Sequence, residues 1–503
     1  MIVAKGKRYI GNNFYQFINS QFGKIKDEEN NQQMEQKFKL LPHQLKVYKY
    51  LQTNWSILLF HKMGSGKTIS SLYPALKFGK PIVVIGPKSS KKSFMDDLEK
   101  LKLFEDINKN NIPPIDWYTF QKAENLMQSQ FDLLKDKTVI IDEAHHLRSQ
   151  TKQMMFIINS LSLAYKLILL TGTPIINHPI DLCVLVNIVK NKEIFTIDKS
   201  LFDFYYVESI SENSFLKLDA NDFLNKLPTI KLRGVEELKT KLSNSISYYE
   251  PPKSNADLQI SVSYPEVPLN QAQLIEYKNY IVRLINPLTK KIVHLETDIN
   301  VDIYNVDFVT LDIKKKNAFL TATRQLSNTI DNDPESPKIR SVVESVVKGP
   351  KPAVIYSNFL ANGIYPISVL LTKYGLSHKM IKGTTSDEKM NSIINDYNEG
   401  QFDVLLISSA ASESITLLNT RQMHILEPHF NEAKINQVIG RAIRYKSHDK
   451  LPVSERKINI YHWTSIFPTS IKYKTADQYL IWLGKKKQIL IDTFVNLIKE
   501  ISI

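Results

Sequence analysis

The sequence predicts an α/β fold with two parallel-sheet lobes in tandem. Short, continuous apolar runs recur along the chain, and each is followed by a turn and a helical pattern. The runs cover residues 57–60, 82–85, 138–141 and 167–170, and the series restarts at 353–356, 404–407 and 423–426. Apolar strands separated by helices are typical of parallel sheets covered on both faces. Two such series therefore indicate two lobes.

Between the two series the composition changes. Residues 191–345 are rich in Asn, Lys and Asp, and they contain one weak strand at 258–264. An acidic, proline-broken stretch at 331–337 resembles a linker. We therefore expect a first lobe with an N-terminal extension over 1–190. A mixed, partly helical insertion and linker would follow over 191–345, and a second lobe with a C-terminal helix over 346–503. A chain of 503 residues is long enough for this division.

The charge of the chain favours a polyanionic partner. Lys and Arg exceed Asp and Glu by 65 to 51, which gives a formal net charge of +14. Phosphate neutralisation by such a surface releases counterions, although a Lys-rich proteome would produce the same surplus. The start lacks a secretory signal, and no apolar segment approaches the ~20 residues of a membrane helix. With Cys183 as its single cysteine, the protein is expected to be soluble and intracellular, without a membrane partner.

Residues 61–68 read His-Lys-Met-Gly-Ser-Gly-Lys-Thr between an apolar strand and a helix, as a Walker A phosphate loop requires. Glycines let the backbone amides face the β-phosphate, the lysine neutralises phosphate oxygens, and the threonine hydroxyl coordinates Mg²⁺. The full pattern begins with glycine where this chain has histidine, and an ordinary glycine turn is the alternative. The predicted ATP-binding residues are His61, Lys62, Met63, Gly64, Ser65, Gly66, Lys67 and Thr68.

An acidic pair follows a later buried strand. Asp142 is suited to hold the Mg²⁺ that bridges the phosphates, and Glu143 to orient and deprotonate the attacking water. Asp-Glu pairs are common on surfaces, but the order of a phosphate loop followed by an acidic pair at another strand end favours a catalytic role. His145 and His146 lack further spaced ligands for zinc. We expect His145 to couple to the γ-phosphate region.

The run Asp-Glu-Ala-His at 142–145 resembles motif II of DEAH/DExH-type superfamily 2 helicases, and Leu-Thr-Gly-Thr-Pro at 170–174 resembles their motif III. The resemblance implies RecA-like lobes, hydrolysis of ATP with Mg²⁺, and a coupling role for Thr171, Gly172 and Thr173. Leu-Pro-His-Gln at 41–44 stands where this superfamily carries a glutamine that reads adenine, which implies that role for Gln44.

The same resemblance implies contacts with a nucleic-acid backbone. Pro-Lys-Ser at 87–89 stands at motif Ia, and Tyr-Thr-Phe at 118–120 at a further strand-contacting motif. Tyr-Ser-Asn-Phe at 356–359 stands at motif IV and residues 408–417 at motif V, where Ser414 replaces the usual glycine and leaves the tightness of coupling open. The implied contact residues are Pro87, Lys88, Ser89, Thr119, Ser357 and Ser408.

Residues 437–444, Gln-Val-Ile-Gly-Arg-Ala-Ile-Arg, are predicted to open a helix with Arg441 and Arg444 on one face. Guanidinium groups can grip phosphate oxygens in bidentate fashion, although a solvated basic face is the alternative. The segment resembles motif VI, whose arginines reach across to ATP on the first lobe. That resemblance implies that Arg444 is the finger, Arg441 a γ-phosphate contact and Gln437 a coupling residue.

A narrower likeness comes from Thr-Arg-Gln-Met-His-Ile-Leu-Glu-Pro at 420–428, the arginine motif, Ser-His at 447–448 and Glu-Arg at 455–456. They resemble ATPases of nucleocytoplasmic large DNA viruses, a group that includes the poxvirus nucleoside triphosphate phosphohydrolase and the small subunit of the early transcription factor. The likeness covers roughly 40–190 and 350–500. It implies nucleic acid as partner, DNA in preference to RNA, and a viral transcription or nuclease complex. The setting would then be the host cytoplasm, a virus factory or the virion, with the oligomeric state open.

Two functions from different classes fit these residues. The first is an ATP-dependent helicase or translocase that moves on or unwinds nucleic acid. The second is an ATPase subunit of a viral transcription complex that uses ATP as a switch or for translocation without separating strands. A degenerate, inactive ATPase is disfavoured because every essential side chain is present. Polarity and the choice between DNA and RNA stay open, since both are contacted through the phosphate backbone.

Overall fold

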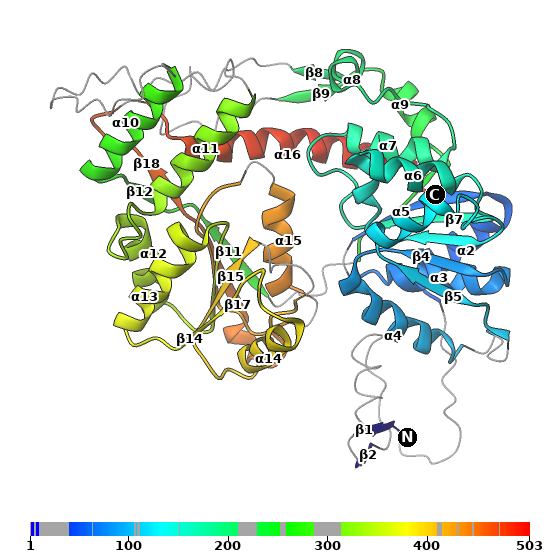
Figure 1. Ribbon diagram of the computed structural model, residues 1–503, viewed down its shortest axis with the longest axis horizontal. Coiled ribbons are helices and arrows are strands. Elements are labelled where there is room, and N and C mark those ends of the chain that lie inside the picture. Colours follow the sequence, from blue (N-terminus) through cyan, green and yellow to red (C-terminus); the bar gives the residue numbers. More distant parts are fainter. Residues whose placement is uncertain are drawn as a thin grey trace.

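The computed structural model describes residues 2–4, 7–9, 40–62, 64–104, 107, 111–149, 151–209, 229–251, 258–285, 313–409, 415–429, 432–444, 447–471 and 473–503. Within them the chain forms two six-stranded parallel sheets flanked by helices, which stand next to each other in Figure 1. The predicted α/β fold with two lobes is confirmed.

The first sheet has the strand order β10-β3-β7-β6-β4-β5, and all its pairs are parallel. Its strands are β3 (Ser56–His61), β4 (Ile82–Ile85), β5 (Ile115–Tyr118), β6 (Thr138–Ile141), β7 (Lys166–Thr171) and β10 (Ile246–Tyr249). Leu58 and Phe60 of β3 join one buried cluster, whereas Ile57 and Leu59 join another. Successive side chains point to opposite faces, so this central strand is apolar throughout because both faces are covered.

Helices cover this sheet and connect its strands. They are α2 (Pro42–Thr53), α3 (Lys67–Phe78), α4 (Lys91–Leu101), α5 (Phe120–Ser129), α6 (Lys152–Leu161), α7 (Ile180–Val189), α8 (Lys199–Tyr206) and α9 (Val235–Leu242). The carboxyl ends of β3, β6 and β7 meet at one edge of the sheet. That edge is where ligands bind in open α/β sheets.

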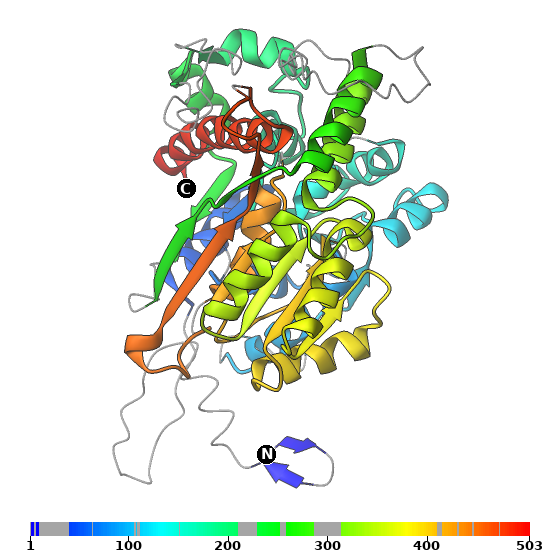
Figure 2. The same ribbon diagram turned by 90° about the vertical axis from the view of Figure 1, so that its left-hand side faces the viewer.

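The second sheet has the order β11-β17-β16-β13-β15-β14 and is also parallel. Its strands are β11 (Gln259–Ser263), β13 (Ala353–Ser357), β14 (His378–Ile381), β15 (Val404–Ser408), β16 (Gln422–Ile425) and β17 (Lys457–His462). Figure 2 shows β11 in green beside β17 in orange. The helices are α10 (Gln271–Ile285), α11 (Ile313–Asn328), α12 (Pro337–Lys348), α13 (Tyr365–Lys373), α14 (Asp387–Asn398), α15 (Glu432–Ala442) and α16 (Ala476–Ile501).

Three short two-stranded ladders complete the described strands. β1 (Ile2–Ala4) pairs with β2 (Lys7–Tyr9), and β8 (Val207–Ser209) pairs with β9 (Ile230–Leu232), both antiparallel. β12 (Glu266–Pro268) pairs in parallel with β18 (Thr464–Ile466). Among the described residues, no helix combines the length and apolar character that crossing a membrane demands.

The region expected as an insertion over 191–345 is divided between the lobes. β10 pairs with β3 in the first sheet, and β11 pairs with β17 in the second. α12 contributes Ile339 and Val342 to the core beneath β13. The predicted boundaries at 190 and 345 therefore differ from the structure. β10 and β11 are edge strands of mixed composition, and their partners lie far away in the sequence, so local composition did not reveal them.

The helix α16 belongs to both lobes, although the sequence placed it in the second. Its first turns pack with α10 and α11 through Ala476, Tyr479 and Leu480. Its last turns bring Phe494 and Ile498 into the core of the first lobe. Figure 1 shows α16 in red crossing from one lobe to the other. Beyond its end, Ser502 Oγ accepts from Tyr248 N at 2.7 Å and so ties the chain to β10.

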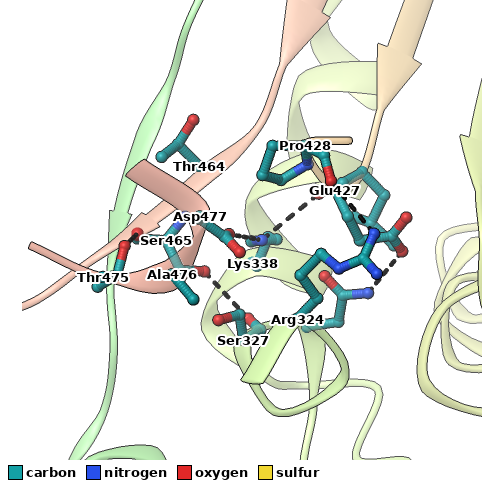
Figure 3. Close-up of polar contacts among 12 residues, drawn as sticks. Arg324, Ser327, Lys338, Glu427, Pro428, Thr464, Ser465, Thr475, Ala476 and Asp477 are labelled. Carbon is teal, nitrogen blue, oxygen red and sulfur yellow. Dashed lines mark hydrogen bonds and ion pairs between the residues drawn. The ribbon is translucent and has the colours of Figure 1, made fainter. Parts of the chain in front are cut away.

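A buried polar network anchors the beginning of α16 in the second lobe (Figure 3). Lys338 Nζ donates to Asp477 Oδ2 at 2.8 Å, and both side chains are at most 1% exposed. The same carboxylate oxygen accepts from Ser465 N at 3.0 Å. Thr475 caps the helix by accepting from Gln478 N at 3.3 Å. A buried ion pair needs such extra hydrogen bonds to offset its desolvation, and here they connect α12, β18 and α16.

Candidate nucleotide and nucleic-acid site

The predicted phosphate loop lies between β3 and α3, at the carboxyl edge of the first sheet. Gly64 and Gly66 have φ of +77° and +73°, a left-handed conformation that favours glycine. A Cβ at position 66 would come within 2.6 Å of Gln44 Nε2. Lys67 and Thr68 open α3, where the helix amides point toward a bound anion. Met63 lies outside the described residues.

Two neighbouring residues in the first turn of α2 support this loop. His43 Nε2 lies 2.9 Å from Ser65 O, close enough for its N–H to donate to that carbonyl. Gln44 is buried, and its Oε1 accepts from Leu41 N at 2.9 Å while its amide nitrogen faces Gly66. Gln44 thus lies against the phosphate loop, and its reading of adenine stays a prediction.

His61 supports the loop instead of contacting phosphate through its side chain. The imidazole is fully buried and hydrogen bonds to Ser247 Oγ of β10 at 3.0 Å. Burial, followed by the positive charges of His43 and Lys67, lowers the pKa of His61 to about 3. The ring is buried against β10, where its Nε2 atom is already hydrogen bonded to Ser247. The expectation that His61 binds the nucleotide is therefore corrected for its side chain.

Lys67 crosses from the phosphate loop to the predicted motif III. A Cβ at position 172 would come within 3.0 Å of Lys67 Nζ, tighter than most real contacts, so Gly172 leaves room for the ammonium. Position 172 directly follows β7, which pairs with β3. The neighbouring strand ends therefore bring together two motifs that are about a hundred residues apart in the sequence.

The acidic pair stands at the end of β6. Burial raises the pKa of Asp142, and the charge of Glu143 adds to this, while the Ser90 hydroxyl and Lys67 oppose it. Burial also works against ionisation of Glu143, but its hydrogen bond to His145 and the charge of Lys67 outweigh burial and lower its pKa to about 2. The carboxylate is therefore ionised and can accept a hydrogen bond from an attacking water, while its role in deprotonating that water stays a prediction.

A chain of polar contacts joins the acidic pair to motif III. Glu143 Oε2 lies 3.2 Å from His145 Nδ1, which lies 3.2 Å from Thr171 Oγ1. Thr171 Oγ1 in turn accepts from Thr173 N at 3.1 Å. Glu143 has φ of +51°, a strained backbone that clusters at functional sites. His145, Thr171 and Thr173, which are among the residues predicted to couple the site, are thus in mutual contact, with Glu143 at one end and the loop after β7 at the other.

The oxygen donors at this edge fit a magnesium ion. Mg²⁺ is usually held by one or two carboxylates or hydroxyls together with substrate phosphates and water. Asp142 and Thr68 belong to the segments that would face the phosphates. A cation would offset both the burial of the Asp142 charge and its repulsion by Glu143, which together raise the pKa of Asp142. Among the described residues, no cluster of three or more His, Cys, Asp or Glu side chains could hold a metal by itself. The donor set therefore fits a metal that arrives with the nucleotide.

The predicted nucleic-acid contacts divide into exposed and buried residues. Lys88 follows Pro87 after β4; its side chain is 85% exposed and lies 3.7 Å from Asp387, at the start of α14 in the other lobe. Thr119 accepts from Lys122 N at 3.3 Å and caps α5. Ser357 is fully buried and donates to Glu427. Ser408 is also buried.

The contacts predicted for the Ser357 and Ser408 side chains are therefore wrong in this conformation, because neither hydroxyl reaches the surface. The side chain of Ser89 and residues 410–414, which include Ser414, lie outside the described part of the chain.

The arginine motif closes a helix, where the sequence predicted that it opens one. α15 ends at Ala442, with Arg441 in its last turn and Arg444 beyond it. Arg444 Nη1 donates to Thr416 Oγ1 of the same lobe. Burial, followed by the like charge of Arg441, lowers the pKa of Arg444 to about 10, so it stays cationic at neutral pH. Its approach to a nucleotide on the first lobe, and the coupling role of Gln437, stay predictions.

Several supporting residues were missed by the sequence reasoning. Ser90 hydrogen bonds with Asp142, and Thr416 holds Arg444. His43 could have been found, because it is adjacent to Gln44 in the same motif. Ser247 and Tyr249 of β10 carried no signal, since their contacts with the loop join residues almost two hundred positions apart.

Two family models match the chain. The SNF2-related domain matches residues 117–214, and the helicase conserved C-terminal domain matches residues 337–446. Their order follows the order of the two lobes, and the second match contains the arginine motif.

Two of the curated relatives come from large DNA viruses. A protein of Acanthamoeba polyphaga mimivirus, provisionally named an ATP-dependent RNA helicase, is 41% identical over 471 residues, which covers 92% of this chain and 97% of the relative. The termination factor NPH-I homologue of a Kenyan pig isolate of African swine fever virus is 22% identical, covering 89% of this chain and 76% of the relative.

The solved structures to which the chain is similar are more distant. The SWI2/SNF2 ATPase core of Sulfolobus solfataricus with double-stranded DNA has 18% identity and a TM-score of 0.34, covering 92% of this chain and 97% of that one. The Hef helicase domain of Pyrococcus furiosus has 13% identity and a TM-score of 0.46, covering 88% and 97%. The assignment of the fold rests on the strand orders given above.

Proposed function

The chain belongs to the superfamily 2 helicases with SNF2-related and helicase C-terminal domains, in the group found in nucleocytoplasmic large DNA viruses, and we propose that it couples ATP hydrolysis to movement along nucleic acid, DNA in preference to RNA. Membership makes it an ATP-hydrolysing enzyme that binds nucleic acid. The proposed parts are the roles of the individual residues in ATP hydrolysis and the preference for DNA over RNA.

The observation that carries the proposal is the contact chain within the first lobe. Lys67 lies over Gly172, while Glu143 reaches Thr171 through His145. The phosphate loop, the acidic pair and the loop after β7 therefore share one set of side chains. Any change in charge at the phosphates would alter the positions of Lys67 and Glu143. Through the contacts of these two side chains it would also alter the positions of Thr171 and Thr173. Such a set of connected side chains can couple ATP hydrolysis to the position of a bound nucleic-acid strand.

In the proposed mechanism, Lys67 neutralises the β- and γ-phosphates, and the amides of the loop and of α3 bind their oxygens. Mg²⁺, held by Thr68 and Asp142, would supply charge neutralisation at the transferred phosphoryl group. Glu143 orients the attacking water. Arg441 and Arg444 complete the site when the lobes close, which makes hydrolysis depend on closure. Lys88, near Asp387 of the second lobe, stands where a bound strand would affect that closure.

The test is ATP hydrolysis at matched ionic strength with no polymer, single-stranded DNA, duplex DNA and RNA, because affinity for phosphate backbones falls steeply with salt. We expect stimulation by DNA above that by RNA. Lys67→Ala and Glu143→Gln should abolish activity in every condition, and unchanged activity in either variant contradicts the site assignment. Stimulation by RNA alone contradicts the preference for DNA.

A second candidate is an ATPase subunit of a viral transcription complex that acts without strand separation. It is favoured by one relative, which is named a termination factor homologue. A strand-displacement assay with a fluorescent duplex separates the two functions. Displacement of the strand during hydrolysis supports unwinding. DNA-stimulated hydrolysis without displacement supports the second candidate.

A further inference from the structure

The strand β10 packs beside the phosphate loop, and it belongs to none of the helicase motifs. It lies outside both segments matched by the family models. Lys62 N donates to Tyr249 O at 2.8 Å where the loop leaves β3. Ser247, two residues earlier, hydrogen bonds with His61. The first residues of the loop therefore depend on β10 for their position.

The ring of Tyr249 contacts the helix α2, which supports the loop. It stacks on the ring of His43 with centroids 3.5 Å apart and planes inclined by 8°. His43 Nε2 lies 2.9 Å from Ser65 O, the residue between the two left-handed glycines. Glycines give the loop little side-chain packing of its own. Fixing the Ser65 carbonyl through a stacked ring therefore fixes the direction of the neighbouring amides, which are the groups that would bind phosphate.

The neighbouring Tyr248 points to the opposite face of the strand and offers a natural contrast. Its ring packs edge-on against Phe60 with centroids 4.9 Å apart, and its hydroxyl donates to Glu250 at 2.6 Å. Lys499 of α16 lies over the same ring at 5.5 Å. Two adjacent tyrosines thus serve different purposes: Tyr248 packs into the core beside α16, and Tyr249 faces the loop.

We propose that Tyr249 is a positioning residue of the nucleotide site, which acts through His43 to hold the phosphate loop in the conformation that binds ATP. The proposal rests on the ATP site described above and adds a residue from β10 to it. Tyr249 acts on the binding of nucleotide and leaves the chemical step to Lys67 and Glu143. Loss of the stack should therefore raise KM for ATP more than it lowers kcat.

The experiment compares Tyr249→Leu, Tyr249→Phe and Tyr248→Leu in the full chain, with DNA-stimulated ATP hydrolysis measured over a range of ATP concentrations. An aromatic stack of this kind corresponds to about a threefold to tenfold change in affinity. We expect Y249L to raise KM by that factor with kcat changed less than about twofold. Y249F keeps the ring and should behave as the parent protein. Y248L should lower the melting temperature and leave KM unchanged.

Equilibrium titration with a fluorescent ATP analogue, without nucleic acid, provides the second measurement. Y249L should weaken binding by the factor seen in KM, and Y249F should not. A KM and an affinity for the analogue that are unchanged in Y249L overturn the proposal, as does an equal rise of KM in Y248L. If the parent protein itself neither hydrolyses ATP nor binds the analogue, the proposed function fails instead, so the two failures are distinguishable.

Discussion

Two glutamates stand just beyond the carboxyl ends of parallel strands, Glu143 after β6 and Glu427 after β16. The Glu143 side chain is 38% exposed, and it contacts His145. The Glu427 side chain is fully buried and accepts from Ser357 Oγ, from Asn358 N at 3.0 Å and from Asn328 Nδ2 at 2.6 Å. Burial raises the pKa of Glu427, with these hydrogen bonds opposing it, whereas the pKa of Glu143 is lowered to about 2.

The different surroundings of the two glutamates indicate different roles for the carboxyl edges of the two sheets. Near Glu143 lie Asp142, Lys67 and His145, the side chains predicted to act on phosphate and metal. Around Glu427 the carboxylate oxygens are satisfied by protein groups, and Arg324 lies nearby (Figure 3). The Arg324 guanidinium packs over the ring of Phe359. The same topological position therefore carries the predicted ligand site in one lobe and a structural network in the other. Fold alone does not distinguish them.

The largest expected effect is the difference in ATP hydrolysis between variants of these two glutamates. Glu143→Gln should lower DNA-stimulated ATP hydrolysis by about 100-fold or more, because it removes a charge that acts at the reacting water. Glu427→Gln should lower it less than about fivefold, since Gln preserves one acceptor in the network. Steady-state kinetics on both variants provides the measurement. Equal losses would mean that the network around Glu427 also belongs to the reaction.

The next effect is on stability in the second lobe. Lys338→Met leaves the Asp477 carboxylate buried without its cation, which should reduce the free energy of unfolding by about 3–5 kcal/mol. Adding Asp477→Asn removes the stranded charge and keeps an acceptor for Ser465 N, so the double variant should recover much of the loss. Urea denaturation of the parent, the single and the double variants measures this. A double variant as unstable as K338M would show that the ion pair is not the source of the effect.

A smaller effect should appear in the pH dependence of stability. The folded-state pKa of Glu143 lies below its usual value of 4.5, so its ionisation stabilises the fold above pH 4.5, and this contribution is lost as pH falls toward about 2. Glu143→Gln does not titrate. The stability difference between parent and variant should therefore shrink as pH is lowered through that window. Denaturation at a series of pH values checks this, and a difference independent of pH argues against the depressed pKa.

The smallest expected effect is that of substituting Lys88 on DNA binding. Its ion pair with Asp387 is highly exposed on both sides and should contribute little to stability. Lys88→Ala should leave the melting temperature unchanged, weaken DNA binding for all sequences alike, and reduce the slope of log affinity against log salt by about 1. Fluorescence anisotropy at several salt concentrations measures the slope. An unchanged slope means that Lys88 does not contact phosphate, and Asp387→Ala serves as the matched control for the lost ion pair.

Much of the first lobe could be predicted because its information is local. The runs 57–60 and 138–141 are apolar on both faces, and the phosphate loop and acidic pair directly follow them. The second lobe was harder at its strand ends. Ser357 and Ser408 stand in the expected motifs, but both are buried, and Ser357 donates to Glu427, seventy residues away in the sequence. Sequence order places a residue at a strand end without saying whether its side chain faces water.

The sequence by itself determined the two α/β lobes and the order of the motifs, and it predicted the residues of the nucleotide site, because apolar periodicity and short-range spacing act within single elements. Only the tertiary structure decided that β10 completes the first sheet, that α16 joins both lobes and that Tyr249 stacks on His43. These features come from pairing and packing between segments far apart in the chain. Local composition does not reveal which distant segments pair or pack together. These partners are fixed only when the segments pack against each other in the folded core.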